Sequence, residues 1–419
     1  MMAPRLLLLT YSFPPANIIG AARPYQIARF FQNKGWDVQV ISIVDESIAD
    51  TDGADLSGLS SVRFEAPKII SWLNTVKNYS GRFGKLKTFL LRSLKFAIRS
   101  SVFPEHFIAL QGVFVTQAMR LAKDKQFDLV ISSALPFSVH CAARNVAKDL
   151  GLPWVADNRD LWAASPYRRT LPIWRLFDRR YERAVLAQAS LVLGISESMV
   201  AYYRDDYHFD HALLVMNGYS LQAQAEINRE NPIGDGLDIV YGGILYNGVR
   251  DPSPLLEAIN SDPDLKAKAC VRFFGSEPAR VSMLADTFRD CAIENHPRVS
   301  KGEISTIYRE ASLLLVILGG GEFENGVMTG KFFEYLAHGK PVLAIASEES
   351  ELAQVINRYG LGLATRSPQR IALFLRAFLA DEVPKTIELP KELSIDHQLS
   401  VLYQAIESLP AFSSRPLAA

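Results

Sequence analysis

The sequence predicts an α/β protein made of two tandem doubly wound (Rossmann-like) domains that face a cleft. Short apolar runs alternate with helical segments, a pattern typical of parallel sheets covered by helices on both faces. The alternation stops in a polar stretch, residues 221–236, and restarts at Leu237. The chain has 419 residues, whereas one hydrophobic core rarely grows beyond about 250–300 residues. Two domains are therefore expected.

The predicted elements follow in chain order. In the first half we expect helices near residues 22–34 and 137–150, and strands at 6–10, 38–43, 129–132, 154–156 and 191–195. In the second half we expect strands at 237–241, 271–274, 313–317 and 342–345. The predicted divisions are a first domain at 1–220, a linker at 221–236, a second domain at 237–385, and a helical tail at 386–419 that packs back on the first domain. Ligands of such sheets bind at the carboxyl ends of the strands, so the two domains are expected to share one site.

Composition excludes several classes of protein. Lys plus Arg and Asp plus Glu are equal at 45 each, which argues against a surface built as a whole to bind nucleic acid. Cys141, Cys270 and Cys291 lack the close spacings of zinc or redox motifs. The first apolar run is too short for a signal peptide, and no run reaches the ~18 apolar residues of a membrane span. We expect a cytoplasmic protein.

The most informative segment is GGGEFENGVMTGKFFEYLAHGKPVLAI, residues 319–345. Its glycine-rich loop, the helix start at Thr329 and Gly330, and the charge of Lys331 all suit a phosphate group. Glu334 lies one turn later on the same helix face, where a carboxylate suits the hydroxyls of a sugar. The sequence therefore predicts a sugar-nucleotide site, with an ordinary strand-to-helix turn as the alternative.

Two lookalike motifs are set aside. A Walker phosphate loop needs Gly at the position of Asn325 and Ser or Thr at that of Phe332. The triplet 262–264, Asp-Pro-Asp, resembles a metal-binding acidic motif, but a proline-containing polar triplet of this kind is more typical of a turn that caps a helix. No metal site is assigned.

Loops at other predicted strand ends of the second domain offer further donor contacts. Backbone at Gly243 is open to a diphosphate, and Arg250 can bind its oxygens with two N–H groups. Gly275 and Ser276 offer backbone against which a nucleobase can lie. A solvent-exposed loop arginine is the alternative for Arg250.

In the first domain, Gly20 follows the first strand and lets a substrate approach the backbone. Asp157, Arg159 and Asp160 follow the strand at 154–156, and Ser133 ends the preceding one. These side chains suit an acceptor, with Asp157 or Asp160 as a base whose ionisation Arg159 sets. An Asp–Arg pair with a helix cap is the alternative.

Residues 66–104 contain eight Lys or Arg and no Asp or Glu. Within 83–99 the cations and the apolar residues fall on separate helical stripes: Lys85, Arg92, Lys95 and Arg99 against Phe83, Leu86, Leu90, Leu94 and Ala97. A basic amphipathic helix of this kind can lie on an anionic membrane surface. A solvated helix whose apolar stripe faces its own core is weighed equally.

Taken together, these segments resemble the retaining glycosyltransferases of the GT-B fold, in the glycosyltransferase family 4 group that builds bacterial surface polysaccharides. The resemblance rests on five stretches that span most of the chain: TYSFPPANIIGAARPYQIARFFQNKGWDVQVIS, PWVADNRDLW, VMNGYS, IVYGGILYNGVRDPSPLLEAI and GVMTGKFFEYLAHGKPVLAI.

The resemblance implies transfer of a sugar from a nucleotide-diphosphate donor to a hydroxyl of a saccharide or lipid-linked acceptor, without metal or cofactor. Arg250 and Lys331 would stabilise the departing diphosphate, and Glu334 would bind the ribose. Gly326 stands where the family usually has the first of two paired glutamates, so the contact to the donor sugar is expected to differ. Glu322, Glu324 or backbone N–H groups are the candidates to replace it.

Two other functions stay open at this point. A sugar-nucleotide epimerase shares the two-sheet fold and needs no acceptor. A non-catalytic protein would bind the sugar nucleotide without turnover.

Overall fold

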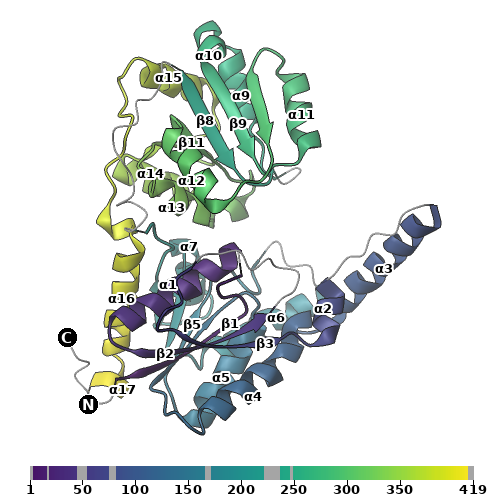
Figure 1. Cartoon of the computed structure of the whole chain (residues 1–419), viewed down its shortest axis with the longest axis vertical. Coiled ribbons are helices and arrows are strands. Elements are labelled where there is room, and N and C mark those ends of the chain that lie inside the picture. The colour runs from purple at the N-terminus through teal and green to yellow at the C-terminus, as the bar shows by residue number, and fades with distance from the viewer. Residues whose placement is uncertain are drawn as a thin grey trace. The chain divides into compact units, whose positions relative to one another are not determined.

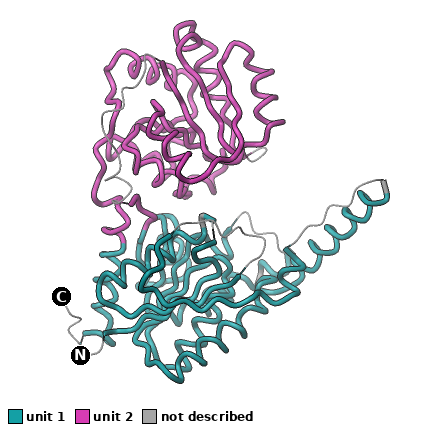
Figure 2. Tube along the Cα trace, viewed as in Figure 1, with its two compact units in different colours: residues 1–215, 399–419 teal, residues 216–398 magenta. Residues whose placement is uncertain are grey.

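The computed structural model describes residues 3–16, 18–44, 54–74, 82–165, 171–220, 236–245 and 249–413. The chain divides into two compact units, residues 1–215 with 399–419 and residues 216–398 (Figure 2). Each unit has its own parallel sheet and its own helices (Figure 1). The prediction of two doubly wound α/β domains is confirmed.

The first unit contains a seven-stranded parallel sheet in the order β3-β2-β1-β4-β5-β6-β7. Strand β1, between β2 and β4, contains a run of leucines, Leu6 to Leu9, that is completely buried because neighbouring strands and helices cover it. The strands are β1 (Arg5–Thr10), β2 (Asp37–Val44), β3 (Ser60–Glu65), β4 (Leu129–Ser133), β5 (Trp154–Asp157), β6 (Leu191–Gly194) and β7 (Ala212–Leu214).

The helices of this unit connect successive strands. Helix α5 shows how sequence sets a boundary, because it ends at Gly151, whose φ of 66° is readily adopted by glycine. The helices are α1 (Ile19–Asn33), α2 (Lys68–Asn74), α3 (Arg82–Ser101), η1 (His106–Ala109), α4 (Leu110–Leu121), α5 (Ser138–Leu150), α6 (Pro172–Leu186) and α7 (Glu197–Asp205).

The second unit contains a six-stranded parallel sheet in the order β10-β9-β8-β11-β12-β13. Its strands are β8 (Leu237–Gly242), β9 (Ala269–Phe274), β10 (Ala292–His296), β11 (Leu313–Ile317), β12 (Val342–Ile345) and β13 (Gly362–Ala364). Its helices are α9 (Ser253–Asn260), α10 (Pro263–Lys268), α11 (Pro278–Thr287), α12 (Lys301–Glu310), η2 (Glu322–Gly326), α13 (Gly330–Leu336), α14 (Glu351–Tyr359), α15 (Pro368–Leu379) and η3 (Lys391–Leu393). As expected for a turn, Asp262 caps α10 by accepting from the N–H of Asp264 at 2.9 Å.

The division between the units lies at 215/216, five residues before the predicted end of the first domain. Residues 216–219 belong to the second unit because they run along the segment before α16: Tyr219 donates to the Leu393 carbonyl and accepts from the Ile395 N–H, both at 3.0 Å. Residues 386–398 accordingly lie in the second unit rather than in a tail on the first. Of the predicted linker, 221–236, only Gly236 lies within the described residues.

Helix α16 (Ile395–Glu407) begins in the second unit and ends in the first, where α17 (Pro410–Ser413) follows. Its last turns pack on helix α1 and the start of β2. Tyr403 lies 5.7 Å from Phe31 between ring centroids, and Phe412 lies 5.9 Å from Trp36. Residues 399–413 therefore belong to the first unit and bury aromatic side chains against it.

Candidate active site

The centre of the second-unit site is Lys331, the second residue of α13. Its ammonium donates a hydrogen bond to the carbonyl of Gly242, at the carboxyl end of β8. Partial burial lowers the pKa of Lys331; Glu334 opposes this shift, whereas Arg250 and Arg298 add to it. A half-buried ammonium beside two guanidinium groups is a place where an anion is favoured.

The position of the Lys331 side chain requires glycine at position 243. Its φ is +155°, and a Cβ there would lie 2.4 Å from Nζ of Lys331. Its N–H donates to the Phe274 carbonyl at 2.8 Å, and its carbonyl accepts from the Ser276 hydroxyl at 2.5 Å. The loops after β8 and β9 are therefore joined, which brings Gly243, Gly275 and Ser276 together.

Two tyrosines, Tyr335 and Tyr308, contact Gly242 at the end of β8. The N–H of Gly242 donates to the Tyr335 hydroxyl at 3.0 Å, and a Cβ at 242 would lie only 1.8 Å from the hydroxyl oxygen of Tyr308. The two rings meet edge to face at 4.9 Å. The carbonyl that binds Lys331 is thus positioned by packing from α12 and α13.

Glu334 lies one helical turn from Lys331. Its side chain is exposed to solvent. Neighbouring protein still removes part of the water around the carboxyl group, and this desolvation raises the pKa of Glu334, while Lys331 and Lys301 lower it. Lys301 and Arg298 were not singled out from the sequence. Arg298 lies in the segment between β10 and α12, and Lys301 is the first residue of α12. Arg298 lies beside Gly275, where an added Cβ would be 3.6 Å from the Cβ of Arg298.

Glu324 binds the backbone of its own glycine-rich loop, the loop after β11. The buried Glu324 carboxylate accepts from the Gly319 N–H at 2.9 Å, so it is engaged with backbone. Glu322, the other predicted replacement, is exposed, and Gly326 ends η2. Thr329 precedes α13 without a side-chain cap, and α13 has only seven residues. The side chains of Lys331, Arg250 and Arg298 therefore add positive charge at the start of α13.

In the first unit, Asp157 ends β5 and is completely buried. Arg23 of α1 binds it at 2.8 and 2.9 Å, and the Ser133 hydroxyl donates to it at 2.7 Å. Burial by itself would raise the pKa of Asp157, but Arg23 and Ser133 hold it below the ordinary value. This geometry fits a carboxylate that joins α1, β4 and β5, and it corrects the expectation of an accessible base. Arg23 was missed, although an arginine within the predicted helix 22–34 needs a partner wherever it is buried.

Arg159 joins the neighbouring loops. It donates to the Gly20 carbonyl at 2.6 Å and to the Ala134 carbonyl, so it fixes the start of α1 against the loop after β4. Asp160, the next residue, is exposed. The structure thus gathers Gly20, Ser133, Arg159 and Asp160 at one edge of the sheet, where Asp160 is the accessible carboxylate.

A buried polar chain lies behind this edge. The Trp154 indole N–H donates to Ser132 Oγ at 2.7 Å, Ser132 Oγ lies 2.7 Å from His140 Nδ1, and His140 Nε2 lies 3.2 Å from Asn158 Oδ1. All members of the chain are satisfied if Ser132 donates to Nδ1 and His140 carries its proton on Nε2. Burial lowers the pKa of His140 to about 4, which keeps the ring neutral.

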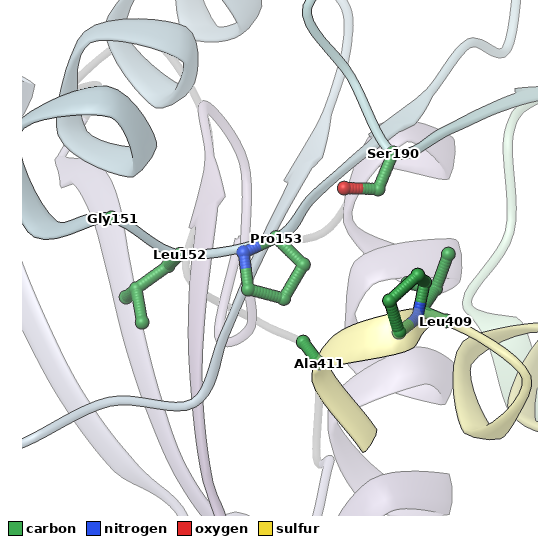
Figure 3. Close-up of a pocket in the computed structure, with 7 residues that line it drawn as sticks. Gly151, Leu152, Pro153, Ser190, Leu409 and Ala411 are labelled. Carbon is green, nitrogen blue, oxygen red and sulfur yellow. The ribbon is translucent and has the colours of Figure 1, made fainter. Parts of the chain in front are cut away.

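An open hollow of about 510 Å³ is lined by residues 151–153, Ser190 and 409–411. Figure 3 shows these lining residues. Residues 151–153 precede β5, so the hollow lies at the amino ends of the strands, opposite the candidate residues. It contains no charged side chain. Among the residues that the structure describes, no cluster of three His, Cys, Asp or Glu is arranged to hold a metal, and no helix is long and apolar enough to span a membrane.

Residues 20–219 match the model of the glycosyl transferase 4-like domain. A search of curated proteins found no match. The chain is similar in structure to sucrose-phosphate synthase from Thermosynechococcus elongatus, with a TM-score of 0.60 and 16% identity over 96% of this chain and 99% of that one. It is also similar to the lipopolysaccharide outer core galactosyltransferase WaaB, with a TM-score of 0.59 and 12% identity over 96% and 99%.

Another similar structure is a UDP-GlcNAc 2-epimerase from Neisseria meningitidis bound to UDP-GlcNAc, with a TM-score of 0.57 and 11% identity over 97% of this chain and 100% of that one. At these identities the similarity concerns the fold. The fold is the two-domain GT-B arrangement of Rossmann-like sheets, as the sequence resemblance implied.

Proposed function

We propose that this protein is a glycosyltransferase that moves a sugar from a nucleotide-diphosphate donor to a hydroxyl of a saccharide or lipid-linked acceptor. The observation that carries the proposal is the half-buried ammonium of Lys331 at the end of β8, next to Arg250, Arg298 and Gly243, which has no side chain. The glycosyl transferase 4-like domain at residues 20–219 supports transfer of a sugar, and the GT-B fold supports a nucleotide donor in the second unit.

In the proposed reaction, the bond between the sugar and the diphosphate breaks while negative charge accumulates on the leaving oxygens. We propose that Lys331 and Arg250 stabilise that charge, since electrostatic stabilisation of this kind is often the largest single catalytic contribution. Protein cations take this role in place of a metal ion. Glu334, Thr329 and Gly330 are proposed to contact the donor, with Glu334 accepting from ribose hydroxyls.

The acceptor is proposed to lie against the first unit, near Gly20, Ser133, Arg159 and Asp160. Asp157 is proposed to hold this region together rather than to accept a proton, because Arg23 and Ser133 occupy its oxygens. We propose transfer with retention of configuration, so that the acceptor approaches the face from which the diphosphate leaves. A role in bacterial surface polysaccharide or glycoconjugate synthesis, at the cytoplasmic face of the membrane, completes the proposal.

The alternative with structural support is a sugar-nucleotide epimerase, because the similar structures include a UDP-GlcNAc 2-epimerase with a comparable TM-score. An epimerase needs no acceptor and releases its product still attached to the nucleotide. The match to a glycosyl transferase 4-like domain over the first unit favours transfer. A non-catalytic binder, in contrast to both enzymes, would show donor affinity without turnover.

The test begins with thermal shifts of the purified protein in the presence of UDP, GDP, ADP and dTDP and their sugar conjugates, since a ligand that binds only the native state raises the melting temperature. The matching donor is then assayed for nucleotide release with and without candidate acceptors. Acceptor-dependent release supports the proposal, whereas a changed sugar still attached to its nucleotide would establish the epimerase.

The matched variants are Lys331→Ala and Lys268→Ala. Lys268 is exposed and ends α10, so it lies at the amino edge of the same sheet, opposite the site. We expect Lys331→Ala to lose turnover by about 10²–10³-fold, the magnitude typical for one electrostatic stabiliser, while Lys268→Ala stays active. Equal activity of both variants would remove Lys331 from the mechanism.

A further inference from the structure

We propose that α3 and the beginning of α6 form one docking face for an anionic lipid bilayer. Helix α3 exposes six large apolar side chains, among them Phe83 at 87% and Phe89 at 65%; the set is Phe83, Leu86, Phe89, Leu90, Leu94 and Phe96. Neighbouring α2 adds Ile69 and Trp72. Figures 1 and 2 show that α3 extends away from the rest of its unit. Its large apolar side chains are exposed along most of its length. A stripe of this kind is typical of helices that lie in the membrane interface.

The cations of α3 have two different roles. Lys95 donates to the carbonyl of Trp72 and lies 4.6 Å above its ring, and Arg99 donates to the carbonyl of Leu73. These two cations bind the last carbonyls of α2 and thereby fix α2 against α3. Lys85 and Arg92, two turns apart, are exposed and flank the apolar stripe. They are the cations of α3 that we assign to lipid headgroups.

Helix α6 continues this face, which the sequence did not indicate. Leu171, just before the helix, and Ile173 and Phe177 within it are 41–54% exposed. The two acidic residues of α6, Asp178 and Glu182, are buried at 2% and 0% exposure. The exposed charges of the helix are therefore arginines, Arg175, Arg180 and Arg183 among them.

Phe103 connects the two helices. It follows α3 directly, and its ring lies 5.3 Å from Trp174 and 5.2 Å from Tyr181 of α6. Trp174 and Tyr181 are partly buried. Ile173 and Phe177 of the same helix are exposed. The carboxyl end of α3 thus lies near α6, and both helices carry arginine or lysine.

The charge of this surface selects its occupant. A second copy of the chain would bring the same cations, because residues 66–104 contain eight Lys or Arg and no acid. An anionic bilayer offers negative headgroups for the cations and an apolar layer for the phenylalanines and leucines at the same time. Docking of this kind needs no donor or acceptor, so its test is independent of the proposed glycosyl transfer.

The test is co-sedimentation of the full chain with vesicles of phosphatidylcholine alone or mixed with phosphatidylglycerol. Three double variants probe the face: Phe89→Ser with Leu90→Ser, Ile173→Ser with Phe177→Ser, and Lys85→Glu with Arg92→Glu. The matched control is Met283→Ser with Leu373→Ser, which removes side chains of 59% and 64% exposure from the second unit. Circular dichroism establishes that each variant is folded.

We expect the wild type and the control to bind the mixed vesicles and not the neutral ones, with binding weakened by salt. Each of the three variants should bind about tenfold more weakly or worse, because each removes either buried apolar area or attraction to the headgroups. Absence of wild-type binding would overturn the proposal, as would variants that bind like the wild type. Loss in the α3 variants alone would remove α6 from the face. Concentration-dependent dimers that the serine variants abolish would make a second copy the occupant.

Discussion

The buried His140 makes the stability of the first unit depend on pH. Its pKa is 6.5 in an ordinary setting and about 4 in the folded protein, because burial disfavours the charged ring. The unfolded chain therefore binds more protons than the folded protein between these two values. Stability is fully present above pH 6.5 and falls as the pH is lowered towards 4.

The magnitude follows from the same shift. Each pKa unit corresponds to about 1.4 kcal/mol, so protonation costs about 3 kcal/mol once the pH is below both values. Between pH 7.5 and pH 5 the loss from His140 is about 2 kcal/mol. Asp157 acts in the same direction at lower pH, since its pKa is also below the ordinary value in the folded state.

The assay is urea denaturation at a series of pH values, in the wild type and in His140→Asn. The variant lowers stability at every pH, because Asn cannot reach both Ser132 and Asn158, but it removes the titrating ring. We therefore expect its stability to fall by about 2 kcal/mol less than that of the wild type between pH 7.5 and 5. An NMR titration of the His140 ring supplies a direct check. Parallel curves for the two proteins, or a ring that titrates near 6.5, would refute the reasoning.

Three further predictions concern the site. Asp157→Asn leaves Arg23 buried without its partner charge, so we expect a loss of about 3–5 kcal/mol in the free energy of unfolding; a variant of wild-type stability without turnover would instead make Asp157 a base. Gly243→Ala forces an unfavourable φ and displaces Lys331. Thermal denaturation should therefore show a loss of about 1–3 kcal/mol in stability, and the turnover assay a large loss of activity. Unchanged turnover would show that Lys331 does not need its present position. Because the pKa of Lys331 is lowered, its charge is lost at a lower pH than that of an ordinary lysine; Lys331→Arg should extend turnover to higher pH, and an unchanged alkaline limb would assign that limb to another group.

The central strands of both sheets were predicted and the outer strands were not. The sequence indicated β1, β2, β4, β5 and β6, and in the second unit β8, β9, β11 and β12, because strands with neighbours on both sides and helices on both faces must be apolar throughout. The four strands that were missed are the outer ones, β3, β7, β10 and β13. Strand β3 (Ser60–Glu65) has no fully buried residue, and β7 and β13 have three residues each. An outer strand is defined by its neighbour, not by its own composition.

The candidate site shows the same distinction. Residues at the ends of apolar strands were found from the sequence, because the carboxyl edge of a doubly wound sheet is where ligands bind. Their partners came from distant segments: Arg23 lies 134 residues before Asp157, and Lys331 lies 89 residues after Gly242. No local pattern connects residues so far apart.

The sequence by itself determined the two-sheet architecture, the edges at which chemistry is expected and the unusual basic segment before residue 104, since these depend on local periodicity and composition. The tertiary structure decided which charges are available. It places Asp157 in a buried ion pair, commits Lys95 and Arg99 to α2, and buries both acids of α6, which leaves that helix basic. A charge acts on a ligand only when the fold leaves it accessible, and that is settled by contacts between segments far apart in the chain.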